Sequence, residues 1–268
     1  MPTARVNGVN LYYEIHGEGP NLVLIEGQGY HTWMWYRQVP AFQRRFRTLI
    51  YDNRGVGRSD KPPGPYSHEQ NADDLAGLLD HLGWERTHVV GVSMGGFIAL
   101  QLALRHPDRL NRLVLVATAF GGPNMAPIPP ETLRALMPDP KLAPRDRIRV
   151  AMPIAFGDER WIDNNRDEFE RILGWRLELP QPAEAAIAQA QAGLTFNVED
   201  RLGEIRAPTL VIAGDRDRVV PSRNAQLLAD RIRGAKLDII EGAGHLAFIE
   251  ESERFNDDVI RFLEEERP

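Results

Sequence analysis

The chain of 268 residues contains no cysteine, which excludes disulfide bonds, thiolate metal sites and thiol nucleophiles. Lysine is also scarce, since only Lys61, Lys141 and Lys236 occur among the 32 basic residues. No apolar run approaches the roughly 20 residues that a membrane-spanning helix needs. The start of the chain also lacks the apolar stretch of a secretory signal. These absences predict a cytoplasmic protein with no membrane partner.

The charge pattern disfavours a polyanionic partner. Acidic residues outnumber basic ones, 38 to 32, and the formal net charge at pH 7 is −6. The two signs alternate along the chain without forming a basic face, so nucleic acid is not expected as a partner. With 43% hydrophobic and 26% charged residues, the composition is that of an ordinary globular protein. A small, near-neutral substrate fits this composition better.

Short apolar runs alternate with helix-period stretches along the chain, which predicts an α/β fold with a mostly parallel central sheet and helices on both faces. Asn7-Gly8 is suited to a tight turn, so the fold is expected to open with an antiparallel hairpin. The expected strands are Arg5–Val6, Leu11–Ile15, Leu22–Ile25, Thr48–Tyr51, Val89–Val92, Leu113–Ala117, Thr209–Ala213 and Leu237–Ile240. The expected helices of this part are Trp35–Phe46, Glu69–Leu82, Met94–Arg105, Ser222–Ile232 and Ser252–Glu266.

The composition of the sequence changes after residue 120. Seven of the 20 prolines fall between Gly121 and Pro144, where they remove backbone donors that a continuing sheet would need. Three helix-like segments follow without a convincing strand, namely Arg147–Phe156, Arg160–Arg176 and Ala183–Leu194. We therefore expect a core domain of residues 1–120 and 200–268, interrupted by a helical cap at residues 121–199.

Apolar side chains of the expected cap either pack its own interior or line a substrate pocket. Periodicity alone does not separate these two roles. The cap residues concerned are Met152, Phe156, Trp161, Phe169 and Trp175. The candidate residues for a pocket, taken over both domains, are Gly27, Met152, Phe156, Trp161 and Leu246.

The strongest chemical signal is Gly91-Val92-Ser93-Met94-Gly95-Gly96, which lies directly between an expected strand and an expected helix. A G-x-S-x-G turn in this context holds a serine on a sharp corner, with small neighbours that relieve crowding. The positive end of the following helix points at the same place, where negative charge would develop in acyl transfer. A glycine-rich turn with a helix-capping serine is the alternative. The context favours Ser93 as a nucleophile.

A serine nucleophile needs a histidine base and an acid that orients it. His245 follows an expected strand in the small-residue segment Gly242-Ala243-Gly244, a setting that none of the other six histidines has. After the preceding expected strand, Asp215 and Asp217 offer two carboxylates, and the residues alone leave the choice between them open. No pair of histidines has metal-ligand spacing, so no metal is predicted.

Together, the elbow, the acid and the histidine resemble the α/β-hydrolase family, in which Ser, Asp and His follow in this chain order. The resemblance covers residues 3–120 and 200–265, includes the loop at residues 52–60 and is loose over the expected cap. It selects Asp217, at the last position of G-x-x-D, as the acid. It also assigns the oxyanion hole to the backbone N–H groups of Met94 and Gln28.

One position departs from that family, which commonly has His-Gly where this chain has Glu26-Gly27. A carboxyl group at the end of a buried strand must be paired or have a raised pKa. We hypothesise that Glu26 pairs with Arg54 or another nearby arginine.

No cofactor is predicted, because the sequence lacks a P-loop and an HExxH motif, and neither glycine-rich loop completes a dinucleotide fingerprint. The resulting hypothesis is a serine hydrolase that cleaves small, moderately hydrophobic carboxylic esters or lactones through an acyl-enzyme. Hydrolysis of a carbon–carbon bond or perhydrolysis on the same triad, or a weakly catalytic ligand receptor of the same fold, are the alternatives. The oligomeric state is left open.

Overall fold

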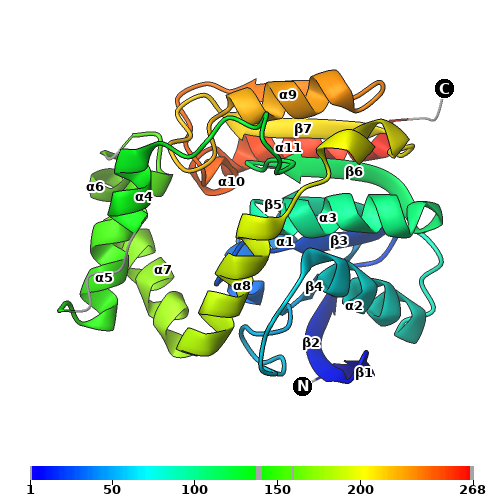
Figure 1. The fold of residues 1–268 in the computed structure, drawn as a ribbon, viewed down its shortest axis with the longest axis horizontal. Helices are drawn as coiled ribbons and strands as arrows, with labels where there is room; N and C mark the ends of the chain where they lie inside the picture. The colour runs from blue at the N-terminus through cyan, green and yellow to red at the C-terminus, as the bar shows by residue number, and fades with distance from the viewer. Residues whose placement is uncertain (1, 137–140, 159, 266–268) are drawn as a thin grey trace.

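The computed structural model describes residues 2–136, 141–158 and 160–265, which form a twisted β-sheet flanked by helices (Figure 1). The sheet is eight-stranded, with the order β1-β2-β4-β3-β5-β6-β7-β8. Pairing is antiparallel between β1 and β2 and between β2 and β4, and parallel throughout the rest. The strands are β1 (Thr3–Val6), β2 (Val9–His16), β3 (Asn21–Ile25), β4 (Arg47–Tyr51), β5 (Thr87–Val92), β6 (Leu110–Val116), β7 (Thr209–Gly214) and β8 (Lys236–Ile240). The predicted fold class is confirmed.

The opening hairpin has the predicted turn. Asn7 and Gly8 both have positive φ, 46° and 83°, as a two-residue turn of type I′ requires. Val6 and Val9 close the ladder on either side of this turn. The turn dipeptide therefore sets the register of the first two strands.

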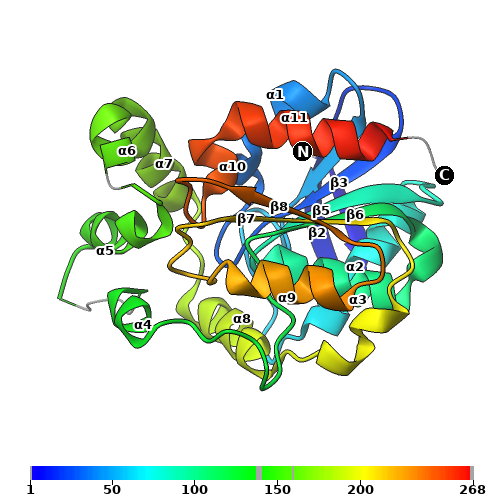
Figure 2. The same ribbon diagram turned by 90° about the horizontal axis from the view of Figure 1, so that it is seen from above.

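Helices cover both faces of the sheet, which Figure 2 shows nearly edge-on. The helices on one face are α2 (His68–His81), α3 (Met94–Arg105) and α9 (Arg223–Arg231), and those on the other are α1 (Val39–Phe42), α10 (Ala247–Glu250) and α11 (Ser252–Glu264). Strand side chains alternate between the two layers, so that Val23 joins one hydrophobic cluster and Leu24 the other. The parallel strands read as continuous apolar runs because both of their faces are buried.

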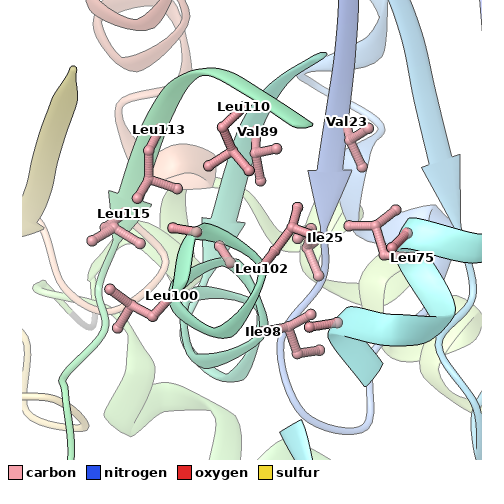
Figure 3. Packing of buried hydrophobic residues seen from close by; sticks show 14 of the residues in the cluster. Val23, Ile25, Leu75, Val89, Ile98, Leu100, Leu102, Leu110, Leu113 and Leu115 are labelled. Atoms are coloured by element: carbon pink, nitrogen blue, oxygen red, sulfur yellow. The ribbon is translucent and has the colours of Figure 1, made fainter. Parts of the chain in front are cut away.

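Figure 3 shows the first of these clusters, in which Val23 and Ile25 of β3 lie near Leu75 of α2 and Ile98 of α3. All four side chains are fully buried. Burying an aliphatic side chain of this size stabilises a fold by about 1.5–3 kcal/mol. This packing holds α3, and with it the turn that precedes α3, against the end of β3.

The residues between β6 and β7 are helical, as the sequence predicts, and project beyond the carboxyl ends of the strands (Figure 1). A β-bridge between Gly121 and Asn197 joins the two ends of this insertion. Its helices are α4 (Pro130–Leu136), α5 (Pro144–Ala151), α6 (Arg160–Asn164), α7 (Arg166–Glu178) and α8 (Ala183–Thr195). Within the described ranges, every helix is too short or too polar to cross a lipid bilayer.

Several side-chain contacts, among them an ion pair and a pair of stacked rings, hold α7 of the insertion to the segment after β3. The Arg37 guanidinium forms an ion pair with the Glu168 carboxylate, with 2.5 Å between Nη2 and Oε2. The rings of Trp33 and Trp175 stack with their centroids 5.6 Å apart.

Several predicted helices are interrupted at proline. The expected helix Trp35–Phe46 is instead a 3₁₀ turn at Thr32–Trp35 followed by α1, because Pro40 lacks an N–H and fits only the first turn of a helix. For the same reason α5 ends at Ala151, and a 3₁₀ turn containing Pro153 continues the chain. The expected helix Arg160–Arg176 is divided into α6 and α7, and α4 and α10 were not predicted.

A buried ion pair joins the loop after β4 to α2. Arg54 donates two hydrogen bonds to Asp74, with Nε–Oδ2 and Nη2–Oδ1 distances of 2.6 and 2.8 Å. The two side chains are only 4% and 2% exposed. Asn7 in the hairpin turn also donates to Asp74. Asp74 therefore connects three segments that are distant in sequence.

Replacing Asp74 by alanine is expected to lower the free energy of unfolding by about 3–5 kcal/mol, because it leaves the Arg54 guanidinium buried without its counter-ion. Its neighbour Asp73 provides a matched control, since it pairs with Arg105 at the surface, where both side chains are more than a third exposed. Asp73→Ala is expected to cost about 1 kcal/mol or less. Urea unfolding followed by circular dichroism measures the free energy of unfolding of both variants. Equal losses would contradict a stabilising role of the buried Arg54–Asp74 pair.

Candidate active site

Ser93 occupies a strained corner between β5 and α3. Its backbone has φ 55° and ψ −118°, a conformation that costs a residue with a side chain on the order of 1–3 kcal/mol. Three hydrogen bonds hold the corner: Ser93 N–H donates to Val116 O at 2.9 Å, and Ser93 O accepts from Gly96 N–H at 2.9 Å and from Thr118 Oγ1 at 2.8 Å. The side chain is half-buried. This is the geometry that the G-x-S-x-G pattern predicts.

Two glycines of the motif are required by close backbone contacts. A Cβ at Gly95 would lie 2.1 Å from Ile25 O, and one at Gly91 would lie 2.3 Å from Gly95 O. Both distances are far shorter than a carbon–oxygen contact allows. The first turn of α3 consequently packs against the end of β3 without any side chain between them.

His245 and Asp217 meet at the same edge of the sheet, where β8 and β7 end. His245 Nδ1 lies 2.8 Å from Asp217 Oδ2, and the Asp217 side chain is fully buried. The other oxygen of Asp217, Oδ1, accepts from the N–H groups of Val219 and Val220 at 2.8 Å each. The carboxylate is thereby fixed with one oxygen toward the imidazole. An Nδ1–H that is held in this way leaves Nε2 as the proton acceptor.

Asp215, the other candidate acid, has a different partner. Its Oδ1 accepts from the backbone N–H of Gly242 at 2.7 Å, and the residue is exposed. Among the described residues, no hydrogen bond joins Ser93 Oγ to His245. Catalytic hydrogen bonds often tighten only when substrate is bound. The three side chains nevertheless share one sheet edge, since each follows the carboxyl end of a parallel strand.

The loop that carries His245 is held by Glu250, which the sequence analysis did not single out. Its Oε1 accepts from Gly244 N–H and its Oε2 from Gly157 N–H in the insertion, both at 2.8 Å. Burial raises the pKa of the Glu250 carboxyl group above its usual value. A carboxylate five residues after the candidate histidine, within an apolar segment, was the available signal.

The insertion also touches this loop through backbone atoms. Leu246 N–H donates to Ala155 O at 3.1 Å, and a Cβ at Gly157 would lie 2.3 Å from Gly242 O. A Cβ at Gly244 would in turn lie 2.4 Å from Gly157 N. The chain segment at residues 155–157 therefore forms a wall against the loop of His245.

The predicted oxyanion loop forms a tight turn beside Ser93. Tyr30 N–H donates to Gly27 O at 3.2 Å, and Gly29 has φ 71°, as the third position of a type II turn requires. A Cβ at Gly27 would lie 3.5 Å from Ser93 Cβ, so this glycine is in contact with the elbow. The Gln28 side chain points into solvent. The turn thus places the Gln28 backbone close to Ser93.

Met94 is the first residue of α3, and the N–H of a first helical residue has no acceptor within its own helix. Its side chain is buried. The positive end of the helix dipole lies at this position.

Glu26 is completely buried at the end of β3, and no arginine among the described residues pairs with it. Its Oε1 accepts from Asn53 N–H at 2.8 Å and from Asn53 Nδ2 at 2.7 Å, while Oε2 has no hydrogen-bond partner among the described residues. The hypothesis that Glu26 pairs with Arg54 is wrong, because the Arg54 guanidinium points to Asp74. Burial, reinforced by the charge of Asp52, raises the pKa of Glu26 well above its usual range. A protonated carboxyl group needs no cation.

The predicted pocket residues of the insertion and of the loop of His245 lie in an apolar cluster. Met152, Phe156 and Leu246 are buried in it, and Phe156 stacks on Trp161 with 4.6 Å between ring centroids. A cavity of about 630 Å³ has a different, charged lining: Gly157, Asp158, Arg160, Asp215, Arg216, Asp217 and Arg218. The role of Met152, Phe156, Trp161 and Leu246 as pocket residues stays a prediction.

Glu26→Gln tests whether this carboxyl group is protonated. A raised folded-state pKa contributes stability that is complete below the ordinary glutamate pKa and is lost as the pH rises through the folded value. Between these two values, the free energy of unfolding of the unmodified chain should fall with pH by up to about 1.4 kcal/mol per pH unit relative to the variant. Urea unfolding from about pH 5 to about pH 8 measures the difference.

Glu85→Gln, at an exposed loop position, serves as the control and should retain the pH dependence of the unmodified chain. Parallel curves for Glu26→Gln, together with a large loss of stability, would show instead that Glu26 is ionised in the folded state.

Comparison with known proteins identifies relatives over nearly the whole chain. A protein of Caulobacter segnis that bears the name carbamate hydrolase RutD is 34% identical over 98% of this chain and 99% of its own length. A Burkholderia vietnamiensis protein named 2-hydroxy-6-oxononadienedioate/2-hydroxy-6-oxononatrienedioate hydrolase is 34% identical, covering 95% of this chain and 91% of its own.

Solved structures agree with these relatives. The enol-lactonase from Burkholderia xenovorans LB400 has a TM-score of 0.86 and 31% identity, covering 98% of this chain and 100% of that chain. The family model described as the alpha/beta hydrolase fold matches residues 20–252. On this match, and on the strand order and serine elbow described above, the chain belongs to the α/β-hydrolase family.

Proposed function

We propose that this hydrolase cleaves carboxylic esters or lactones of small, moderately hydrophobic substrates through an acyl-enzyme. The observation that carries the proposal is the hydrogen bond between His245 Nδ1 and the buried Asp217 carboxylate, at the sheet edge where Ser93 occupies its strained corner. A relative that is an enol-lactonase supports the substrate class. In this proposal residues 121–199 act as a cap over a core of residues 1–120 and 200–268.

In the first half of the reaction, Ser93 Oγ attacks the substrate carbonyl while His245 Nε2 takes its proton. The backbone N–H groups of Gln28 and Met94 receive the negative charge that develops on the carbonyl oxygen. Asp217 holds the imidazole in the required tautomer and stabilises the imidazolium. His245 then gives the proton to the leaving alcohol, and the acyl group stays on Ser93.

In the second half, a water molecule loses a proton to His245 and attacks the acyl-enzyme. The same N–H groups receive the oxyanion, and the bond between the acyl carbon and Ser93 Oγ breaks as His245 gives the proton back to Ser93 Oγ. The carboxylic acid then leaves. The pocket residues proposed for the acyl or alcohol part are Gly27, Met152, Phe156, Trp161 and Leu246. No step of this scheme requires a cofactor.

A second candidate activity is supported by the relative named for a 2-hydroxy-6-oxo dienedioate. Hydrolysis of such a substrate at a carbon–carbon bond would use the same serine, histidine and oxyanion donors, so only the shape of the pocket discriminates. A carbamate is a further acyl substrate of the same chemistry, in line with the relative named for it.

The expected result for Ser93→Ala is a loss of kcat on the order of 10⁶-fold, since this residue forms the covalent bond in the proposed mechanism. The substrates to compare are p-nitrophenyl esters of increasing acyl length, several lactones, an aryl carbamate and a 2-hydroxy-6-oxo dienoate. The fastest class identifies the reaction.

Ser222→Ala is a suitable control, because Ser222 is a half-buried serine directly before α9 and its side chain makes no capping hydrogen bond. This variant should keep full activity. Turnover that survives in Ser93→Ala would refute the nucleophile. Absence of turnover and of labelling by a fluorophosphonate in the unmodified protein would favour the ligand-receptor alternative.

A further inference from the structure

Two glutamine side chains of the insertion reach across to the loops at the ends of β3 and β4. Gln189 lies on α8, which leads from the insertion back toward the sheet (Figure 1), and is only 1% exposed. Gln181 lies just before α8 and is half-buried. A polar side chain as buried as Gln189 is rarely found without specific hydrogen-bond partners.

The Gln189 amide group is hydrogen-bonded at both of its ends. Its Oε1 accepts from Gly29 N–H at 3.2 Å and from Gln181 Nε2 at 2.9 Å. Its Nε2 donates to Arg54 O at 3.5 Å, the longest of these contacts. Gln181 Nε2 makes a further bond to Gly55 O at 3.2 Å. The strongest partner of Gln189 outside the insertion is therefore the Gly29 N–H.

Gly29 belongs to the turn from Gly27 to Tyr30 described above. Its N–H lies one peptide unit after the Gln28 N–H, the group that the proposed mechanism assigns to the oxyanion. Among the described residues, Gln28 N–H has no hydrogen-bond acceptor of its own. Its position thus depends on the contacts of the other residues of the turn, among them the contact of Gly27 with Ser93 and the bond from Gly29 to Gln189.

This restraint differs from the other contacts between the insertion and the core. The Arg37–Glu168 ion pair and the Trp33–Trp175 stack hold α7 to residues after the turn. Arg176 of α7 reaches the turn itself but lies over the side-chain ring of Tyr30, 4.3 Å from its centroid, whereas Gln189 binds a backbone N–H. Only a small displacement is needed for an effect on rate, because a shift of about 1 Å in a positioned group can cost about 10²-fold.

We propose that Gln189 is a positioning residue for the oxyanion hole: its side-chain oxygen holds Gly29 N–H and thereby aligns the Gln28 N–H with the oxygen of the carbonyl group that Ser93 attacks. The proposal rests on the proposed function, since it assumes that Gln28 receives the oxyanion. On this proposal, full turnover requires that α8 lies against the turn, so that Gln189 can bind Gly29 N–H.

The test compares three variants with the unmodified protein on the best ester or lactone. Gln189→Leu removes the acceptor, and kcat is expected to fall about 10- to 100-fold with KM changed less than about threefold. Gln189→Glu keeps an acceptor for Gly29 N–H but loses the donor to Arg54 O and adds a negative charge near the turn, so kcat should return in part, to a value clearly above that of Gln189→Leu. Gln101→Leu is the matched control, because Gln101 is also buried, at 4% exposure, and binds Glu69 on α2.

The outcomes distinguish a role of Gln189 in positioning the Gln28 N–H from a role in holding the insertion against the core. A rise in KM with unchanged kcat, an equal loss of kcat in Gln101→Leu, or a Gln189→Glu variant as slow as Gln189→Leu would overturn the proposal. If Gln189→Leu does not fold, as judged by its thermal melt, Gln181→Leu replaces it and should lower kcat in the same way by a smaller factor.

Failure of the proposed function has a different signature, which is turnover or fluorophosphonate labelling that survives in Ser93→Ala. If no ester or lactone is turned over, the rate of labelling of Ser93, followed by mass spectrometry, replaces kcat. An unchanged labelling rate in Gln189→Leu would refute positioning, and the absence of labelling in the unmodified protein would refute both proposals.

Discussion

The site depends on the absence of side chains between the first turn of α3 and the end of β3. Gly95 lies against Ile25 O so closely that no Cβ fits, and this contact brings the serine corner beside Gly27. Hydrophobic packing of α3 on the sheet stabilises the approach, and hydrogen bonds from neighbouring strand ends hold the strained residue. The close contact at Gly95 therefore helps to set the distance between the strained corner at Ser93 and the turn that carries Gln28.

Three of the buried carboxyl groups in this part of the fold are stabilised in three different ways. Asp74 has an arginine partner, and breaking that pair leaves a buried cation. Asp217 faces an imidazole and two backbone N–H groups. Glu26 bonds to an asparagine, and burial raises the pKa of its carboxyl group well above the usual range. In the protonated form that this shift favours, Glu26 adds no negative charge beside the turn that carries Gln28, where the proposed reaction develops one.

Much of this arrangement was predictable because it follows from local patterns in the sequence. The strands are short apolar runs, the hairpin follows from Asn7-Gly8, and the serine corner follows from glycines at fixed spacing. The partner of Glu26 was not predictable, since the direction of the Arg54 side chain depends on where α2 packs. The breaks at Pro40 and Pro153 were visible in the sequence but were outweighed by helical periodicity. Gln189 carries no motif, and its role emerges only from the tertiary contacts of α8.

The backbone contact between the insertion and the loop of His245 bears on how far this fold can be divided into parts. Glycines at 157 and 244 let two chain segments touch directly, and Glu250 bonds to the N–H groups of both. A foreign cap grafted between β6 and β7 would have to supply the same glycine and the same backbone path at that point. The insertion is thus not an interchangeable module, and an exchange of this segment to change specificity has to leave residues 155–157 and their contacts with the loop of His245 in place.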